Sequence, residues 1–347
     1  MRKIWTAAVT ASLLSILSNP VLAADSPKPL FASDDIISFT LSGPLNGISR
    51  KPDAKPVPGT LKLNGPTPET LPVMLSTRGI TRKLREICSF PPLRVTFTAK
   101  PGKDSLFKGQ KELKLVTHCQ SGDRYQQDVF LEFSAYRLYR ALTPQSFNAR
   151  LAKVDYANED GQPIMTRYGF FLEDISDVAH RNGQSRFRGA KKISQTQLNP
   201  EAAARFAVFQ YVISNLDWAM TANAGDRECC HNSRLMGAKE TATDLITVPY
   251  DFDYSGLVDA PYALPPDGIN VANVRVRRYR GFCRHNEQAQ AFAATLSARR
   301  ASLLSIVDQT PQLSEGSRKR AASYLGESFD LIGSPAKISD MLKTCLP

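Results

Sequence analysis

Three aspartates in the second half of the sequence are spaced so that they could do chemistry on a phosphorylated substrate. Asp251 and Asp253 follow the apolar run 245–248 and precede a Ser-Gly turn, and Asp217 ends a long amphipathic segment. Alternate residues of an extended chain share a side, so we expect the carboxylates of Asp251 and Asp253 to face the same way. Many phosphate-transfer sites hold magnesium and a base with acids placed in this manner.

Each of these acids also has a structural explanation. Asp217 could cap a turn after the helix that ends near Ser214, because aspartate is frequent in turns. Two neighbouring carboxylates repel each other unless a cation or hydrogen bonds compensate, and a structural calcium site would be one such compensation for Asp251 and Asp253. A metal-assisted hydrolase that uses all three acids is a further alternative. Its histidine supply is thin, because none of the four histidines forms the spaced pairs of common metallohydrolases.

The elements that must position these acids change type along the chain. The first half contains short β-favouring runs separated by Pro, Gly and Asn, then a helix that Pro144 ends, then two more strands. The expected strands are 36–41, 59–63, 71–75, 93–97, 112–116, 152–156 and 165–172, and the helix between them covers 129–142. The second half is mainly helical, with helices that begin at Pro200 and that cover 286–309, 314–332 and 337–345.

The N-terminus has the composition of an export signal. Arg2 and Lys3 precede a short apolar stretch, and Val21-Leu22-Ala23 fits the small-residue rule for signal peptidase. We therefore expect a signal peptide over 1–23 and a tether over 24–33. No later stretch is long and apolar enough for a membrane helix. The mature protein is expected in a periplasm or in the medium.

Export changes how the cysteines are interpreted, because disulfides form outside the cytoplasm. The mature chain contains six of them: Cys88, Cys119, Cys229, Cys230, Cys283 and Cys345. Cys88 with Cys119 is the most local pairing, and Cys283 could pair with Cys345 or with one of the two adjacent cysteines. A zinc site that adds His231 and His285 to the later cysteines is the alternative, but the spacing matches no standard zinc pattern.

The chain is basic, with 44 Lys+Arg against 33 Asp+Glu and a formal net charge of +11. Loss of Arg2 and Lys3 with the signal peptide lowers this charge to +9. A positive balance favours phosphates and other anionic partners, such as acidic envelope components. The basic clusters 78–85 and 275–280 match no known nucleic-acid-binding motif, so we expect no nucleic-acid partner.

Four segments of the chain resemble, in order, those of the spore-coat protein H kinase-like family of exported proteins. They are Arg78-Gly79 with the basic segment to Phe97, Tyr168–Glu173, Asn215–Trp218 followed by His231-Asn232, and Pro249-Tyr-Asp-Phe-Asp253. The last two are the specific ones. The resemblance implies an α+β, two-lobed protein-kinase-like fold, with a β-rich N-terminal lobe over 34–175 and a mainly helical C-terminal lobe over 176–347.

The resemblance also implies phosphoryl transfer from ATP or another nucleotide, with Mg²⁺ or Mn²⁺, to an exported protein or an anionic envelope component. Asp217 would be the catalytic base, and Asn232, Asp251 and Asp253 would hold the metal. The implied nucleotide-binding residues are Lys114 or Arg94 as the phosphate-neutralising cation, Glu132 as its helix partner, and Glu173 at the end of the hinge strand.

The sequence departs from the family pattern at several points. The interval from Asp217 to Asn232 is longer than a kinase catalytic loop, and Asn223 is an alternative metal ligand at a more usual distance. No glycine-rich loop of the G-x-G-x-x-G kind is present. Lys114 could instead point to solvent, and Glu132 could lie on the surface of its helix. These gaps leave open a catalytically inactive scaffold that binds an anionic envelope ligand.

Overall fold

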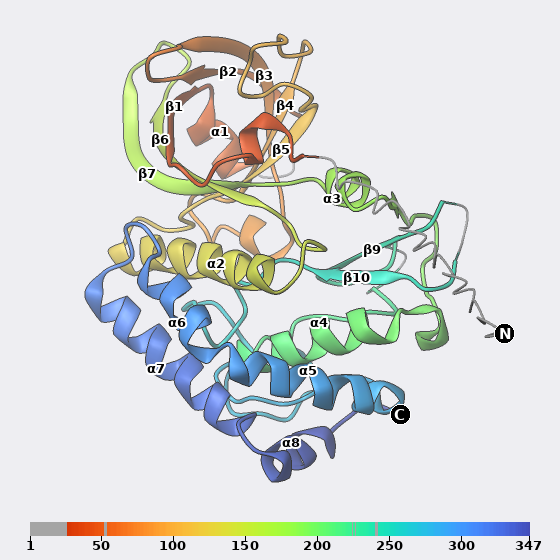
Figure 1. Cartoon of the computed structure of the whole chain (residues 1–347). Coiled ribbons are helices and arrows are strands. Elements are labelled where there is room, and N and C mark those ends of the chain that lie inside the picture. The colour runs from red at the N-terminus through yellow and green to blue at the C-terminus, as the bar shows by residue number, and fades with distance from the viewer. Residues whose placement is uncertain (1–25, 52–53, 224, 226, 240–241) are drawn as a thin grey trace, which may run out of the picture.

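The strands of the first half close into a barrel. The computed structural model describes residues 26–51, 54–223, 225, 227–239 and 242–347, and the predicted signal peptide lies outside them. The barrel strands are β1 (Ile37–Ser42), β2 (Val57–Leu63), β3 (Glu69–Thr77), β4 (Leu93–Phe97), β5 (Glu112–Val116), β6 (Ala149–Ala157) and β7 (Pro163–Leu172). They are arranged in the order β1-β2-β3-β4-β5-β7-β6 (Figure 1).

The predicted two-lobed protein-kinase-like fold is wrong. β1 pairs in parallel with β6, with Ile37 opposite Ala152, and this pairing closes seven strands into a mixed barrel. The second half is not simply a helical lobe either. It contributes all three strands of a second sheet, β8 (Ser185–Arg186), β9 (Ser233–Gly237) and β10 (Ile246–Pro249).

Eight helices accompany the two sheets in the described part of the chain. They are α1 (Leu45–Arg50), α2 (Asp123–Leu142), α3 (Ile175–Arg181), α4 (Pro200–Val212), α5 (Asn286–Ala298), α6 (Arg300–Asp308), α7 (Glu315–Leu331) and α8 (Pro335–Leu342). Short 3-10 turns cover Pro29–Phe31, Thr81–Lys83, Gln195–Gln197 and Cys283–His285. α2 lies directly beneath the barrel, and α4 to α8 lie below it (Figure 1). No described helix is long and apolar enough to cross a membrane.

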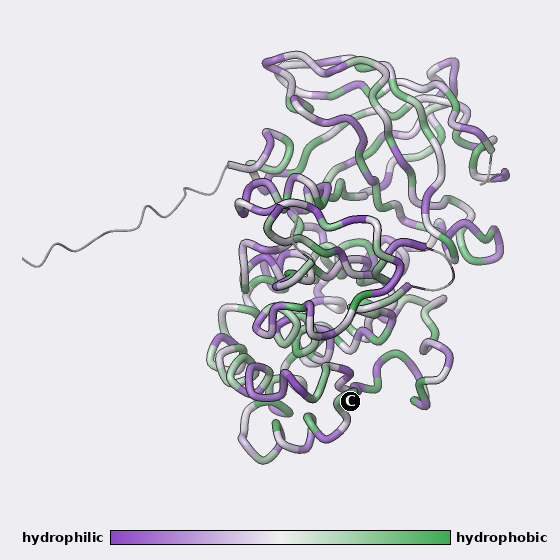
Figure 2. Tube along the Cα trace, turned by 90° about the vertical axis from the view of Figure 1, so that its right-hand side faces the viewer, coloured by the Kyte–Doolittle hydropathy of each residue, from purple (hydrophilic) through white to green (hydrophobic). Residues whose placement is uncertain are grey.

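Local sequence explains where several of these elements begin and end. The side chain of Asn199 accepts a hydrogen bond from the backbone N–H of Ala202, and Pro200 occupies the first position of α4, as predicted. Apolar and polar residues alternate along β1 and β4, so that every second side chain of these strands is buried inside the barrel. Hydrophilic and hydrophobic residues are interspersed along the whole described chain (Figure 2). The predicted helix 286–309 is instead two helices, which meet at Arg299.

The buried apolar side chains form two clusters. One fills the barrel and includes Phe39, Leu75 and Phe171, together with Leu30 and Phe31 from the segment 24–33. The other joins α2, α4 and the helices that follow to the second sheet. α2 therefore packs between the barrel and the helical part of the molecule, and it can carry side chains to the boundary between them.

All six cysteines form disulfides, as is typical of exported proteins. The predicted Cys88–Cys119 pairing is confirmed, and Cys283 pairs with Cys345, which was one of the alternatives. The third disulfide joins the adjacent Cys229 and Cys230. No cysteine is left free, so these thiols are not available as the zinc ligands of the alternative interpretation.

Candidate functional site

A cavity of about 300 Å³ opens where the barrel meets the second sheet. Its walls come from the segment that follows β3, from β4 and β5, from the segment between α4 and β9, and from the chain that follows β10. Six of the predicted site residues line it: Arg94, Lys114, Asp217, Asn232, Asp251 and Asp253. Segments that are distant in the sequence thus bring acids and cations into one space.

The segment that carries Asp251 and Asp253 is held at both ends. β10 ends at Pro249, and Asp251 has a left-handed backbone conformation with φ of +65°. Its N–H donates to the hydroxyl of Tyr136 on α2 at 2.8 Å. At the other end the N–H of Gly256 donates to Ser214 at 2.9 Å, and a Cβ at Gly256 would lie 2.7 Å from the carbonyl oxygen of Val274. The two acids therefore lie in a fixed turn, and not on the extended strand that the alternation argument assumed.

Both of these acids contact Arg82, a residue that sequence reasoning did not assign to the site. The Arg82 guanidinium lies 2.9 Å from Asp251 Oδ1, 3.2 Å from Asp253 Oδ2 and 3.6 Å from Glu132 Oε2. The side chains of Arg82 and Asp253 are almost fully buried, whereas 27% of the Asp251 side chain is exposed. Glu132 thus pairs with a basic residue, as the resemblance implied, but this residue is Arg82 and not Lys114 or Arg94.

One guanidinium faces three carboxyl groups here, and the pKa values reflect that imbalance. Burial raises the pKa of Glu132 to about 8 and that of Asp253 to about 7, although Arg82 opposes both shifts. Burial also opposes ionisation of Asp251, but Arg82 and Arg78 together hold its pKa below the ordinary value. Burial disfavours the charged form of Arg82, but Asp253 and its other anionic neighbours raise the Arg82 pKa. A further cation beside Glu132, Asp251 and Asp253 would therefore be stabilised by their carboxylates.

Glu132, Asp251 and Asp253 could hold a metal ion. One carboxylate oxygen from each lies within 4.8 Å of the others. Oε1 of Glu132 is buried and has no hydrogen-bond partner, so this oxygen could ligate a cation. Carboxylate oxygens are the ligands that hard divalent cations prefer. Glu132 thus joins Asp251 and Asp253, two of the three predicted metal ligands, whereas the amide of the third, Asn232, donates to Asp217.

Asn232 and His231 together orient Asp217. The Nδ2 of Asn232 donates to Asp217 Oδ2 at 2.9 Å and to its backbone oxygen at 2.8 Å, and His231 Nε2 lies 2.6 Å from Asp217 Oδ1. Asp217 is partly exposed to the cavity, with 24% of its side chain accessible. Its backbone is tied down as well, because Asn215 Oδ1 accepts a hydrogen bond from the Asp217 N–H at 3.0 Å. This carboxylate is therefore preorganised at the cavity wall.

Basic side chains line the cavity as well. Lys114 on β5 is half-buried, and burial together with Arg78 and Arg234 lowers its pKa to about 8. The Arg234 guanidinium lies 4.2 Å from the ring centre of Tyr250 and donates to its hydroxyl. Arg94 contributes less positive charge to the cavity, because it forms an ion pair with Glu112 on the neighbouring strand.

Glu173, which the resemblance placed near the nucleotide, lies outside the cavity. Its carboxylate is buried and pairs with Arg181, with Oε1 3.0 Å from the Arg181 Nε. Its other oxygen accepts the N–H of Asn148 at 2.9 Å. Burial raises the pKa of Glu173 against the effect of Arg181. These contacts join the end of β7 to α3 and the start of β6.

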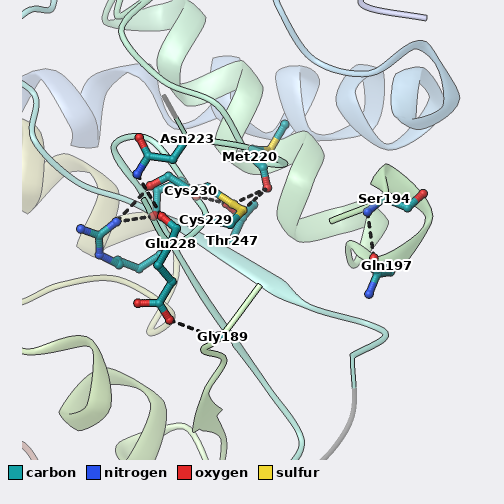
Figure 3. Close-up of a disulfide and its surroundings, with 11 residues drawn as sticks. Gly189, Ser194, Gln197, Met220, Asn223, Glu228, Cys229, Cys230 and Thr247 are labelled. Atoms are coloured by element: carbon teal, nitrogen blue, oxygen red, sulfur yellow. Dashed lines mark hydrogen bonds between the residues drawn. A yellow bond between two sulfur atoms is a disulfide. The ribbon is translucent and has the colours of Figure 1, made fainter. Parts of the chain in front are cut away.

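The Cys229–Cys230 disulfide lies directly before His231 and Asn232. The N–H of Cys229 donates to the carbonyl oxygen of Ala190 at 2.9 Å, and Cys230 Sγ lies 3.0 Å from the carbonyl oxygen of Met220. Asn223, the alternative metal ligand, instead donates to the backbone oxygen of Glu228 at 2.9 Å (Figure 3). The disulfide thus directly precedes the two residues that orient Asp217, and it lies behind the residues that line the cavity.

Sequence reasoning missed Arg82, Arg234 and the role of His231. Arg82 lies within the basic cluster 78–85, and His231 directly precedes Asn232, so both residues belong to segments that the sequence analysis had singled out. No sequence pattern indicated that Arg82 would contact Asp251 and Asp253, or that His231 would contact Asp217. No protein-family model and no curated protein sequence matches this chain. The resemblance to the spore-coat protein H family therefore stays a prediction.

Proposed function

We propose that this cavity is a metal-dependent phosphotransferase site, which moves a phosphoryl group from a nucleotide to a hydroxyl of an exported protein or envelope component. The single observation that supports it most is that Asp217 lines the same cavity as Asp251, Asp253 and Lys114. Phosphoryl transfer needs an oriented base, cations for the phosphate oxygens and a divalent ion, and little else from the protein. The proposal does not depend on a kinase-like fold.

The chain's own residues divide these tasks. Asp217, oriented by His231 and Asn232, accepts the proton of the acceptor hydroxyl. The oxygen of that hydroxyl forms a bond to the terminal phosphorus of the donor at the same time. Lys114 neutralises the negative charge of the phosphate oxygens. The bond between the terminal phosphorus and the bridging oxygen of the donor breaks, and the rest of the donor leaves with that oxygen. Glu132, Asp251 and Asp253 would hold Mg²⁺ or Mn²⁺, which supplies further charge neutralisation when bound.

A second candidate is a binding protein for an anionic envelope ligand, without catalysis. One observation favours it: Arg82 already contacts all three acids that would hold the metal. In that case the acids are structural and the cavity only provides positive charge. The predicted export also favours this candidate, because little ATP is present outside the cell. A phosphotransferase there could instead use another nucleotide as its donor.

The decisive experiment combines binding with transfer. The mature protein with oxidised cysteines is titrated with ATP and GTP in the presence of Mg²⁺ or Mn²⁺, and thermal stability is recorded. At a hundredfold excess over the dissociation constant, the stabilisation is about 2.7 kcal/mol. Labelled terminal phosphate is then followed to the protein, to water and to envelope extracts.

The outcomes separate the candidates. Transfer that is lost in Asp217→Asn supports the phosphotransferase. Metal-independent binding without transfer supports the scaffold. Failure of every nucleotide to bind, under conditions in which the protein is folded, contradicts the phosphotransferase.

A further inference from the structure

We propose that the ligand of this cavity is a chain of two or more phosphate groups, and that the cavity recognises this chain without recognising a nucleobase. This inference rests on the proposed function and specifies its donor. Both free polyphosphate and the polyphosphate group of a nucleotide have the required chemistry.

The first argument is a group of cavity-lining cations that do not take part in the close ion pairs of the described residues. Arg78, Lys114 and Arg234 all line the cavity, and none of the ion pairs in the described part of the chain includes any of them. Lys114 Nζ lies 5.6 Å from the ring centre of Tyr250, on which Arg234 also rests. Like charges held together in a partly buried space raise the free energy until an anion binds. Burial is the main cause of the lowered pKa of Lys114, and repulsion by Arg78 and Arg234 lowers that pKa further.

The second argument is the overall charge of the cavity. Six guanidinium or ammonium groups line it (Arg78, Arg82, Arg94, Lys114, Arg227 and Arg234), against the three carboxylates of Asp217, Asp251 and Asp253. The cations on the barrel side and the acid cluster border one space. A chain of phosphates offers separate oxygens to the cations and to a metal ion at the acids, whereas a single phosphate has too few to serve both well.

The third argument concerns the apolar surface. A nucleobase is normally clamped between apolar or aromatic faces. Among the described lining residues, the large apolar side chains are Ile80, Pro92, Tyr250 and Tyr254. Arg234 and Lys114 already lie over the Tyr250 ring, Tyr254 packs against Tyr262 with ring centres 5.8 Å apart, and Ile80 is 61% exposed. These side chains leave no pair of apolar faces to enclose a base.

Isothermal titration of the full mature protein in excess Mg²⁺ tests the inference with five probes: tripolyphosphate, ATP, GTP, adenosine and orthophosphate. We expect the dissociation constants of the first three to agree within about threefold, less than 1 kcal/mol. Adenosine should not bind, and orthophosphate should bind at least about tenfold more weakly. Lys114→Met should weaken tripolyphosphate and ATP equally, by about tenfold or more. Lys111→Met, at an exposed position three residues earlier, is the matched control and should change neither.

The outcomes distinguish this inference from the function on which it rests. ATP that binds more than about tenfold tighter than both tripolyphosphate and GTP would show recognition of the base, which overturns the inference and leaves the phosphotransferase standing. Orthophosphate that binds as tightly as tripolyphosphate also overturns the inference. If none of the phosphate compounds binds, both proposals fail. Circular dichroism of each variant confirms that a loss of binding is not a loss of folding.

Discussion

Nε of Arg82 lies 3.2 Å from Oδ2 of Asp253, and this contact joins the segment after β3 to the segment after β10. Replacement of one member of a buried ion pair leaves its partner without compensation. We therefore expect Arg82→Met to lower the free energy of unfolding by about 3–5 kcal/mol, measured by urea denaturation near neutral pH. The matched control is Arg94→Met, whose pair with Glu112 is about 40% exposed and should change stability by less than about 1 kcal/mol.

Metal addition to the same variant tests the acid cluster. With Arg82 gone, Glu132, Asp251 and Asp253 keep their carboxylates but lose their cation. Millimolar Mn²⁺ should then stabilise Arg82→Met more than it stabilises the unchanged protein. If Mn²⁺ stabilises neither protein, the acids do not bind the metal, and an equal stabilisation of both would mean that Arg82 does not compete with it.

Asp217→Asn should reduce phosphoryl transfer by about 10²- to 10⁴-fold, because the amide cannot accept the proton of the acceptor hydroxyl. Nucleotide binding should change little, since the cations of the cavity are untouched. Transfer kinetics and calorimetric titration measure the two effects separately. Asp104→Asn, at an exposed barrel loop, is the control for loss of a carboxylate. Transfer that survives in Asp217→Asn would exclude this residue as the base.

The pH dependence of stability should reveal Lys114. Its folded-state pKa of about 8 lies below the ordinary 10.5, so the unfolded chain binds one more proton between these two values. The free energy of unfolding therefore rises with pH across this window, by at most about 3 kcal/mol from this group. Lys114→Met lacks that contribution.

Urea unfolding of both proteins at pH 7.5 and pH 10 isolates the effect. The variant should be the more stable protein at pH 7.5, and its advantage should shrink by pH 10. For Lys111→Met the difference from the unchanged protein should be the same at both pH values. A pH-independent difference for Lys114→Met would contradict the lowered pKa.

Removal of the Cys283–Cys345 disulfide should destabilise the protein strongly. The two cysteines are 62 residues apart and tie the segment before α5 to the C-terminal strand-like bridge at Leu346. A disulfide that closes a loop of this length lowers the conformational entropy of the unfolded chain, and it thereby raises the free energy of unfolding by about 2–4 kcal/mol. The double variant Cys283→Ser with Cys345→Ser, unfolded in urea, measures this loss. Because neither cysteine lines the cavity, the affinity for tripolyphosphate should be unchanged while the protein is folded.

Local chemistry made much of the secondary structure predictable. β4 and β5 have the predicted bounds, because their β-branched and apolar residues alternate between turn residues. α4 begins where Asn199 and Pro200 indicated. Closure of the barrel could not be predicted, since it depends on the pairing of β1 with β6 across more than a hundred residues, for which no local pattern exists.

The site was predictable in part for the same reason. Asp217, Asp251 and Asp253 were chosen because carboxylates near turns stand out in sequence, and all three do line the cavity. The participation of Arg82 depends on a contact with the chain after β10, and its local sequence is that of an ordinary basic surface segment. Glu173 shows the opposite error, because its position after an apolar strand resembled a site residue while Arg181 was its partner.

The Cys88–Cys119 disulfide has a consequence for when the protein becomes competent. It fastens the segment that carries Arg78 and Arg82 to the end of β5, next to the backbone contact between Phe90 and Cys119. Without this bond the segment would be held to the end of β5 by hydrogen bonds alone, such as the one from the N–H of Phe90 to the carbonyl oxygen of Cys119. Oxidation of Cys88 and Cys119 would therefore complete the attachment of Arg78 and Arg82 at the cavity wall.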